Sequence, residues 1–168
     1  MKQVIILFLG LIISVGLNAQ SSDCKCCTDK NSEFDFWVGS WNVTNKKGDL
    51  AGTSVIEKIQ DNCIISENWK SAKGTYTGMS SNFYNTKTDE WEQMWLDNQG
   101  GSLHLKGKRV GNQMILQTDE VLNKEGKTFV NRITWTANDD GTVSQLWEMI
   151  TDGDITVAFN GLYKKVKY

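Results

Sequence analysis

The sequence contains no proline, only one histidine and no run of five or six like charges. Because proline would remove hydrogen-bond donors from a β-ladder, its absence is compatible with sheet throughout. The net charge of −2, without a charged run, does not indicate a nucleic-acid or membrane-surface patch. A single imidazole also excludes active sites built on two or more histidines. The chain has no apolar run of the ~20 residues that a transmembrane helix needs.

The first nineteen residues have the layout of a secretory signal peptide. Lys2 supplies a positive start, Val4–Val15 is almost wholly apolar, and the small residue Ala19 precedes Gln20. We therefore predict that residues 1–19 are a signal peptide. The mature chain is expected to be exported, periplasmic or secreted, without membrane insertion after cleavage. A retained membrane anchor is the alternative, and the shortness of the apolar run argues against it.

The remaining chain divides into a short arm and one domain. Residues 20–33 are polar and rich in cysteine, and we interpret them as a flexible arm. Residues 34–168 alternate short segments rich in Val, Ile, Thr, Trp and Tyr with turn segments rich in Gly, Asn and Asp. This pattern predicts ten strands: Phe36–Thr44, Thr53–Ile59, Ile64–Trp69, Tyr76–Tyr84, Glu90–Asp97, Ser102–Lys108, Gln113–Thr118, Phe129–Thr136, Val143–Ile150 and Ile155–Lys164.

Ten strands joined by short links predict an all-β fold, because parallel βαβ units need longer crossovers. A meander of this length has two edges to protect, and closure removes both. We therefore expect an antiparallel up-and-down barrel of about ten strands. An open β-sandwich is the alternative, since alternation alone does not separate the two.

Several short segments carry a family resemblance. The first is Phe34–Val43, which contains Gly39-x-Trp41 at the start of a predicted strand. It is followed in order by Ser81-Asn82-Phe83-Tyr84, Trp91-x-Gln93-x-Trp95-x-Asp97-Asn98-x-Gly100-Gly101, Arg132-x-Thr134-Trp135, Gln145-Leu146-Trp147-Glu148 and Phe159-x-Gly161-x-Tyr163. From Phe34 to the C-terminus the chain resembles a bacterial family of lipocalin-like, calycin-type barrels of unknown function.

The resemblance implies a barrel with an internal cavity, and it implies no activity. It also implies that Gly39 and Trp41 belong to a barrel-closing motif, in which a basic side chain packs across the tryptophan. Arg132 is our candidate for that basic residue, and Lys164 is the second candidate.

Alternation of side chains along a strand identifies the candidate cavity. In Glu90–Asp97 one face combines aromatic with amide and carboxyl groups, which a ligand site needs. Similar mixtures on other strands complete the predicted ligand-binding set: Glu67, Trp69, Trp91, Gln93, Trp95, Asp97, Arg132, Gln145, Trp147 and Tyr163. We predict a non-enzymatic barrel, without cofactor or metal, that binds a small, partly apolar molecule in its lumen. Alternatively, the tryptophans fill a solid barrel with a structural or interaction role.

Two catalytic or cofactor-binding alternatives follow from the polar residues. Glu67, Asp97 and Glu148 would serve a hydrolase if two of them faced each other as acid and base. His104 would serve as a haem ligand if it faced the lumen. Because His104 lies between Leu103 and Leu105, we expect it to face solvent.

The four cysteines are Cys24, Cys26, Cys27 and Cys63. In an exported protein an even count indicates disulfides, and we expect Cys63 to bond one cysteine of the arm. The other two are expected not to bond each other, because closely spaced pairs are strained. Alternatively, the three arm thiols bind a soft metal such as Cu(I) or Zn(II).

Overall fold

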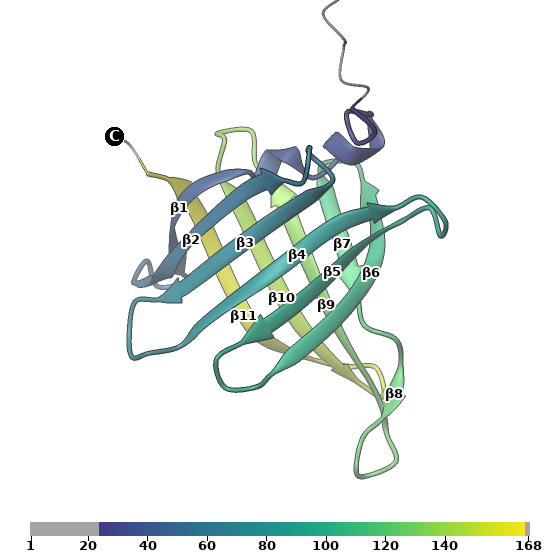
Figure 1. Ribbon diagram of the computed structural model, residues 1–168. Coiled ribbons are helices and arrows are strands. Elements are labelled where there is room, and N and C mark those ends of the chain that lie inside the picture. Colours follow the sequence, from purple (N-terminus) through teal and green to yellow (C-terminus); the bar gives the residue numbers. More distant parts are fainter. Residues whose placement is uncertain (1–23, 167–168) are drawn as a thin grey trace, which may run out of the picture.

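The computed structural model describes residues 24–166, which form a closed antiparallel β-barrel (Figure 1). Its strands lie in the order β10-β11-β1-β2-β3-β4-β5-β6-β7-β9-β8, and β9 also pairs with β10. This second pairing closes the ring. The bounds are β1 Gly39–Asn45, β2 Leu50–Ile59, β3 Ile64–Ser71, β4 Thr77–Asn85, β5 Glu90–Asp97, β6 Ser102–Val110, β7 Gln113–Gln117, β8 Val121–Leu122, β9 Thr128–Ala137, β10 Val143–Thr151 and β11 Asp154–Lys165.

The predicted all-β barrel is therefore confirmed, and the open sandwich is wrong. Each of the ten strands other than β8 has at least two hydrogen-bonded neighbours, so the ring leaves no long unpaired edge among the described residues. The short strand β8, which the sequence did not predict, forms a ladder with β9 beyond the barrel body, at the lower right of Figure 1.

The first predicted strand begins too early. Asp35–Trp37 form a 3₁₀ helix, η2, and the strand starts at Gly39. Side chains three residues apart lie on one side of a 3₁₀ helix, so Phe34 and Trp37 turn inward together. Their rings stack with centroids 5.0 Å apart, and both side chains are completely buried. Burial of two aromatic rings thus outweighs the extended propensity of this segment.

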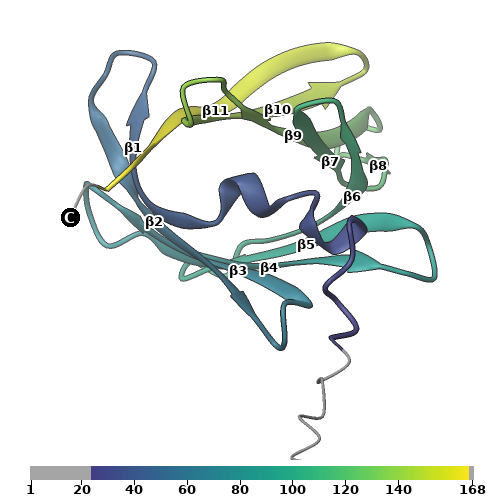
Figure 2. The ribbon, with the colours of Figure 1, turned by 90° about the horizontal axis from the view of Figure 1, so that it is seen from above.

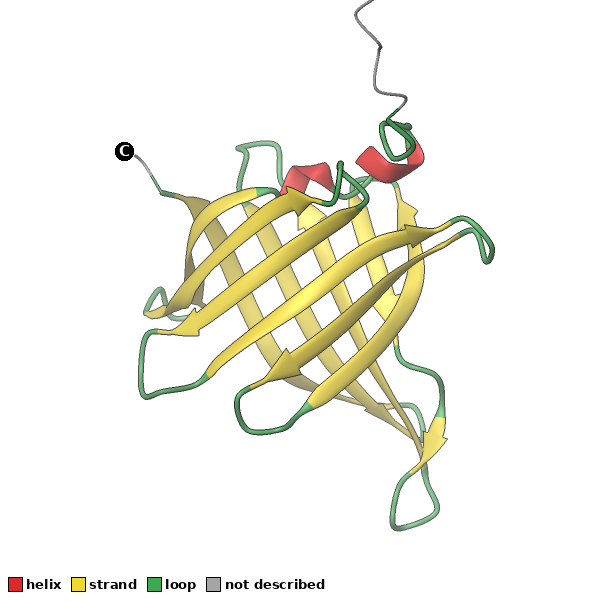
Figure 3. Ribbon diagram, viewed as in Figure 1, coloured by secondary structure: helices red, strands yellow, loops and turns green. Residues whose placement is uncertain are grey.

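The two short helices, η1 (Lys30–Ser32) and η2, lie across one end of the barrel (Figures 2 and 3). Phe34 contacts Trp91 and Trp135 edge-on, at centroid distances of 5.7 and 5.2 Å. We call the cluster Phe34, Trp37, Trp41, Trp91 and Trp135 the aromatic plug. All five are at most 2 % exposed, so this end of the barrel is solid.

Lys165 covers the tryptophan of the barrel-closing motif. Its Nζ lies 5.4 Å from the centroid of the Trp41 ring, and the two residues are direct register partners on β11 and β1. Both predicted candidates, Arg132 and Lys164, are therefore wrong. Lys164 precedes Lys165 and so points to the opposite face of the strand. The Trp41 Nε1–H donates to the carbonyl of Trp37 over 2.9 Å.

Two disulfides tie the described part of the predicted arm to the barrel. Cys26 bonds Cys63, which confirms the predicted link to the cysteine between β2 and β3. Cys24 bonds Cys27, and the expectation that these two stay apart is wrong. A turn, closed by a hydrogen bond from the Cys27 amide to the Cys24 carbonyl, brings their Cα atoms to 5.4 Å. That separation is ordinary for a disulfide.

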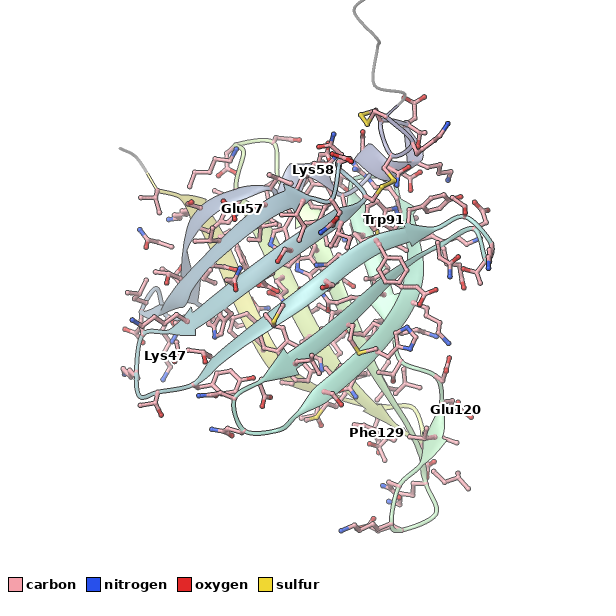
Figure 4. The ribbon with its side chains drawn as sticks, in the orientation of Figure 1. Lys47, Glu57, Lys58, Trp91, Glu120 and Phe129 are labelled. Carbon is pink, nitrogen blue, oxygen red and sulfur yellow. A yellow bond between two sulfur atoms is a disulfide. The ribbon has the colours of Figure 1, made fainter. Side chains whose placement is uncertain are left out.

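Residues 24–33 are consequently held in place rather than free. Besides the disulfides, the Lys58 ammonium donates to the Asn31 carbonyl, and Arg109 donates to the Glu33 carbonyl. Figure 4 shows Lys58 beside these first described residues. Because all four cysteines are oxidised, the proposed soft-metal site loses its thiolate ligands. Disulfides persist in oxidising compartments, which agrees with an extracytoplasmic type of environment.

The predicted signal peptide, residues 1–19, lies outside the described residues, as does the start of the arm. Within residues 24–166, no helix is both long and apolar enough to cross a membrane.

Candidate functional site

The barrel half opposite the plug contains a cavity of about 290 Å³. Its wall is formed by residues of seven strands, most of them at alternate positions, together with Tyr76 between β3 and β4. The lining residues are Ala51, Glu67, Trp69, Ser71, Tyr76, Gln93, Trp95, Leu103, Ile133, Trp135, Gln145, Trp147, Ala158, Phe159 and Tyr163. The lumen is thus neither an empty tube nor a solid core: one end is filled and the other is hollow.

Three aromatic rings of the cavity approach the barrel wall closely at positions where the wall carries glycine. A Cβ atom added to Gly52 would come within 2.5 Å of the Trp69 ring, and one added to Gly78 within 2.2 Å of the Trp95 ring. The Phe159 ring lies over Gly161 in the same way, with 2.6 Å to the added atom. Any larger residue would push these rings inward. The three glycines therefore keep space open in the lumen.

A buried polar network crosses the inner wall of the cavity. Glu67 on β3 accepts hydrogen bonds from the Ser54 hydroxyl at 2.9 Å and the Ser80 hydroxyl at 3.0 Å. The Asn82 amide donates to Ser80 at 3.0 Å, and the Gln93 amide donates to Asn82 at 2.7 Å. These five side chains are at most 5 % exposed. Cross-strand register explains the arrangement. Ser80 is the register partner of Glu67, and Ser54 is the partner of Trp69, which lies on the same face of β3 as Glu67.

The carboxyl group of Glu67 has an unusual protonation equilibrium. Burial raises its pKa from 4.5 to about 7, and the two serine hydrogen bonds offset only part of that effect. Burial also raises the pKa of Tyr163 well above its ordinary value, so that phenol stays neutral and donates to the Gln145 side chain. The cavity thus holds one carboxyl group that exchanges its proton near neutral pH.

Most of the predicted ligand-binding residues do line this cavity. The structure brings together Glu67, Trp69, Gln93, Trp95, Gln145, Trp147 and Tyr163. They come from four strands, and the alternation rule identified the inward face correctly on each of them.

Trp91 and Asp97 lie on the predicted face of β5 but at the wrong depth. Trp91 belongs to the plug, where its Nε1–H donates to Glu33 at 3.1 Å, and Figure 4 shows it near the helix-covered end. Asp97 is instead the last residue of β5. Its carboxylate accepts the backbone N–H groups of Gln99 and Gly101, and these hydrogen bonds lower its pKa.

Arg132 does not line the cavity, and the prediction that its side chain faces the lumen is wrong. Its neighbours Asn131 and Ile133 are buried, so Arg132 points outward from β9. There its Nε–H donates to the Glu148 carboxylate over 3.1 Å, and its second guanidinium nitrogen, NH2, forms an ion pair with the same oxygen at 3.0 Å. This geometry also removes Glu148 from the lumen.

The carboxyl groups of the hydrolase alternative are therefore not assembled. Glu67 lines the cavity, Asp97 caps a turn and Glu148 forms an ion pair on the outer face. His104 faces outward as expected, with its Nε2 2.7 Å from Glu92. Among residues 24–166, no group of three or more His, Cys, Asp or Glu side chains gathers as a metal would require.

Sequence reasoning missed the residues that complete the site. Tyr76 lies just before β4, and its hydroxyl donates to Asp97 at 3.2 Å. Trp135 forms the boundary between plug and cavity. Ser54 and Ser80 give no signal by themselves, since small polar residues are common in strands. Only the cross-strand register shows that they face Glu67.

No known protein family matches this chain, and no curated protein resembles it significantly. Membership of the lipocalin-like family thus remains a prediction from the segments quoted above, with which the closed ten-stranded barrel is consistent.

Proposed function

We propose that this protein binds a small, partly apolar molecule in the hollow half of its barrel, without transforming it. The observation that carries the proposal is the cavity of about 290 Å³, whose wall combines seven aromatic side chains with four polar ones, Glu67, Ser71, Gln93 and Gln145. Ligand pockets are mostly apolar, contain a few oriented polar groups and begin at roughly 300 Å³. The volume therefore supports a ligand of modest size.

The glycines beneath the aromatic rings favour this proposal over a solid structural barrel. A core that serves only stability is filled to close packing by side chains. Here Gly52, Gly78 and Gly161 leave room for rings to approach the wall, and the rings of Trp69, Trp95 and Phe159 line the cavity while remaining only half-buried. Aromatic surface that the protein itself leaves uncovered is available to a ligand.

A fluorescence titration tests the proposal. A ligand in the cavity would touch the indoles of Trp69, Trp95 and Trp147 and change their emission. Fatty acids, retinoid-like molecules, haem, short glycans and small aromatic compounds form the screen. We expect at least one saturable change with the intact protein. Absence of any saturable change across these classes, confirmed by calorimetry, would reject ligand binding.

Two variants test whether the ligand binds in the lumen. Trp95→Ala removes a wall of the cavity and should weaken binding, whereas Met94→Ala changes the next residue, which is 39 % exposed and points outward. Large truncations of buried side chains cost roughly 3–5 kcal/mol, so the folding of Trp95→Ala is checked by circular dichroism first. Equal loss of binding in both variants would place the ligand elsewhere.

We further propose that the protein acts after export, with a mature chain that starts at or near Gln20. The signal-like residues 1–19 and the two disulfides support this. N-terminal sequencing of protein from its own host tests it. An intact Met1 on a cytoplasmic protein would contradict export.

A further inference from the structure

We infer that the ligand is a small organic cation: an ammonium group attached to an apolar or aromatic body, with the ammonium beside Glu67. This inference rests on the proposed ligand-binding function and specifies the chemical class. It is carried by the charge pattern of the cavity wall and by the distribution of its aromatic rings.

The charge pattern favours a cation. Glu67 is the one ionisable carboxyl group of the lining, and among residues 24–166 the cavity wall includes no Lys, Arg or His side chain. A carboxylate buried to 5 % exposure without a positive partner is costly, and a ligand ammonium would supply that partner. An anionic ligand would meet no cationic group and would face the Glu67 charge.

The Glu67 carboxylate retains the capacity to bind such a group. Each of its oxygens accepts one serine hydroxyl, Oε1 from Ser54 and Oε2 from Ser80. A carboxylate has about four acceptor positions, so two remain for ligand N–H groups. The serines hold the carboxyl plane in place without neutralising it.

The aromatic rings favour the same class. Trp69, Trp95, Trp147 and Phe159 line the cavity, with Trp69 and Phe159 meeting edge to face at a centroid distance of 6.0 Å. The faces of such rings attract ammonium groups, and this attraction strengthens when both partners are removed from water. A carboxylate together with several indoles recognises an organic cation better than it recognises a neutral molecule of the same shape.

Three matched probes test the inference. They are 2-phenylethylammonium, the neutral 2-phenylethanol and the anion 3-phenylpropionate, which share a phenyl ring and differ in charge. Calorimetry at pH 8, where Glu67 is ionised, should show the cation binding at least about tenfold more tightly than the alcohol. The anion should bind more weakly still.

Substitution of Glu67 tests whether its carboxyl group causes the preference for the cation over the neutral alcohol. Glu67→Gln should weaken binding of 2-phenylethylammonium about tenfold and leave 2-phenylethanol within about twofold, since charge-assisted hydrogen bonds are roughly twice as strong as neutral ones. Glu57→Gln is the matched control, because Glu57 is an exposed residue of β2 (Figure 4) and should change neither affinity. Thermal unfolding verifies that both variants are folded.

A cation whose own charge does not change with pH separates the titration of Glu67 from that of the ligand. Benzyltrimethylammonium should bind more tightly as the pH rises from 6 to 8, because Glu67 loses its proton in this range. The other titratable groups facing Glu67, the phenols of Tyr76 and Tyr163, have raised pKa values and stay neutral. The pH dependence should disappear in Glu67→Gln.

The outcomes separate this inference from the proposed function. If 2-phenylethanol or 3-phenylpropionate binds as tightly as the cation, or if Glu67→Gln leaves cation binding unchanged, the ligand class is wrong and luminal binding stands. If the charged and neutral probes all fail while another class in the screen binds, only the cation inference is overturned. Failure of every compound overturns both.

Discussion

The indole ring of Trp95 on β5 lies directly over Gly78 on β4, so closely that a Cβ at position 78 would come 2.2 Å from Cζ2 of the ring. The two positions are diagonal neighbours, since Ser80 pairs with Trp95 and Gly78 with Asp97. This contact sets the position of the ring: held against the wall, it lines the cavity without filling it.

Gly78→Ala should therefore close part of the cavity. The added methyl group meets the ring and, at 3.0 Å, the Leu96 carbonyl, so the ring is the part that moves inward. We expect about tenfold weaker ligand binding, with a stability loss of roughly 1–3 kcal/mol from overpacking. Calorimetry and urea unfolding measure the two effects. Met79→Ala, at the neighbouring outward position, should leave binding unchanged; unaltered binding in Gly78→Ala would contradict this role of the glycine.

Glu67 should make the protein less stable as the pH rises. Its folded-state pKa of about 7 lies above the ordinary 4.5, so below pH 4.5 both states are protonated and no penalty exists. Between these values the unfolded chain loses its proton first, and stability falls. The full penalty, about 3 kcal/mol, is present above pH 7.

The Glu67→Gln variant lacks this penalty. Its free energy of unfolding, measured relative to that of the unmodified protein, should therefore rise by about 3 kcal/mol as the pH increases from 4.5 to 8. Urea unfolding at several pH values measures the difference. Carboxyl groups with lowered pKa values, such as Asp89 and Glu92, make the folded protein more stable as the pH rises. They do so equally in both proteins and therefore cancel in the difference. A constant difference across this pH range would show that Glu67 is not the responsible group.

The two disulfides should contribute unequally to stability. Cys26–Cys63 closes a separation of 37 residues and joins the first described residues to the barrel, whereas Cys24–Cys27 closes a separation of three. Replacing Cys26 and Cys63 by serine should cost roughly 2–4 kcal/mol, and replacing Cys24 and Cys27 distinctly less, because a longer loop restricts the unfolded chain more. Urea midpoints of the two double variants compare them; the reverse order would contradict this account.

Two tryptophans of the plug offer a matched test of hydrogen bonding. Both Trp37 and Trp41 are at most 1 % exposed, but the Trp41 N–H is hydrogen-bonded, while within the described residues the Trp37 N–H has no partner. Trp41→Phe should therefore cost about 1–2 kcal/mol more than Trp37→Phe, because only the former leaves an acceptor unpaired. Chemical denaturation of the two variants measures the difference, and equal costs would argue against it.

The pattern of residues was sufficient to predict the barrel and the inward face of its strands. Strand propensity, frequent turn residues and the absence of proline are local properties, and alternation follows from backbone geometry. Glu67, Trp69, Trp95 and Gln145 were accordingly assigned to the cavity from sequence. The same alternation places Lys164 and Lys165 on opposite faces of β11, although the predicted partners of Trp41 were Arg132 and, as the second candidate, Lys164 rather than Lys165.

Depth along the barrel was decided by the tertiary structure. Trp91, Gln93, Trp95 and Asp97 share one face of β5, yet the first lies in the plug, the next two in the cavity and the last in a turn. Strand periodicity contains no information about which end of the barrel is filled. That depends on η2, which places Phe34 and Trp37 inside one end, and on contacts between residues far apart in the chain.

The sequence by itself thus determined that the chain forms an antiparallel barrel with an aromatic and polar interior, because propensity and alternation act between near neighbours. Only the tertiary structure decided that half of this interior is hollow and that Glu67 stands in it between Ser54 and Ser80. Packing, cross-strand register and desolvation act between residues that are distant in sequence, and they exist only once the sheet has closed.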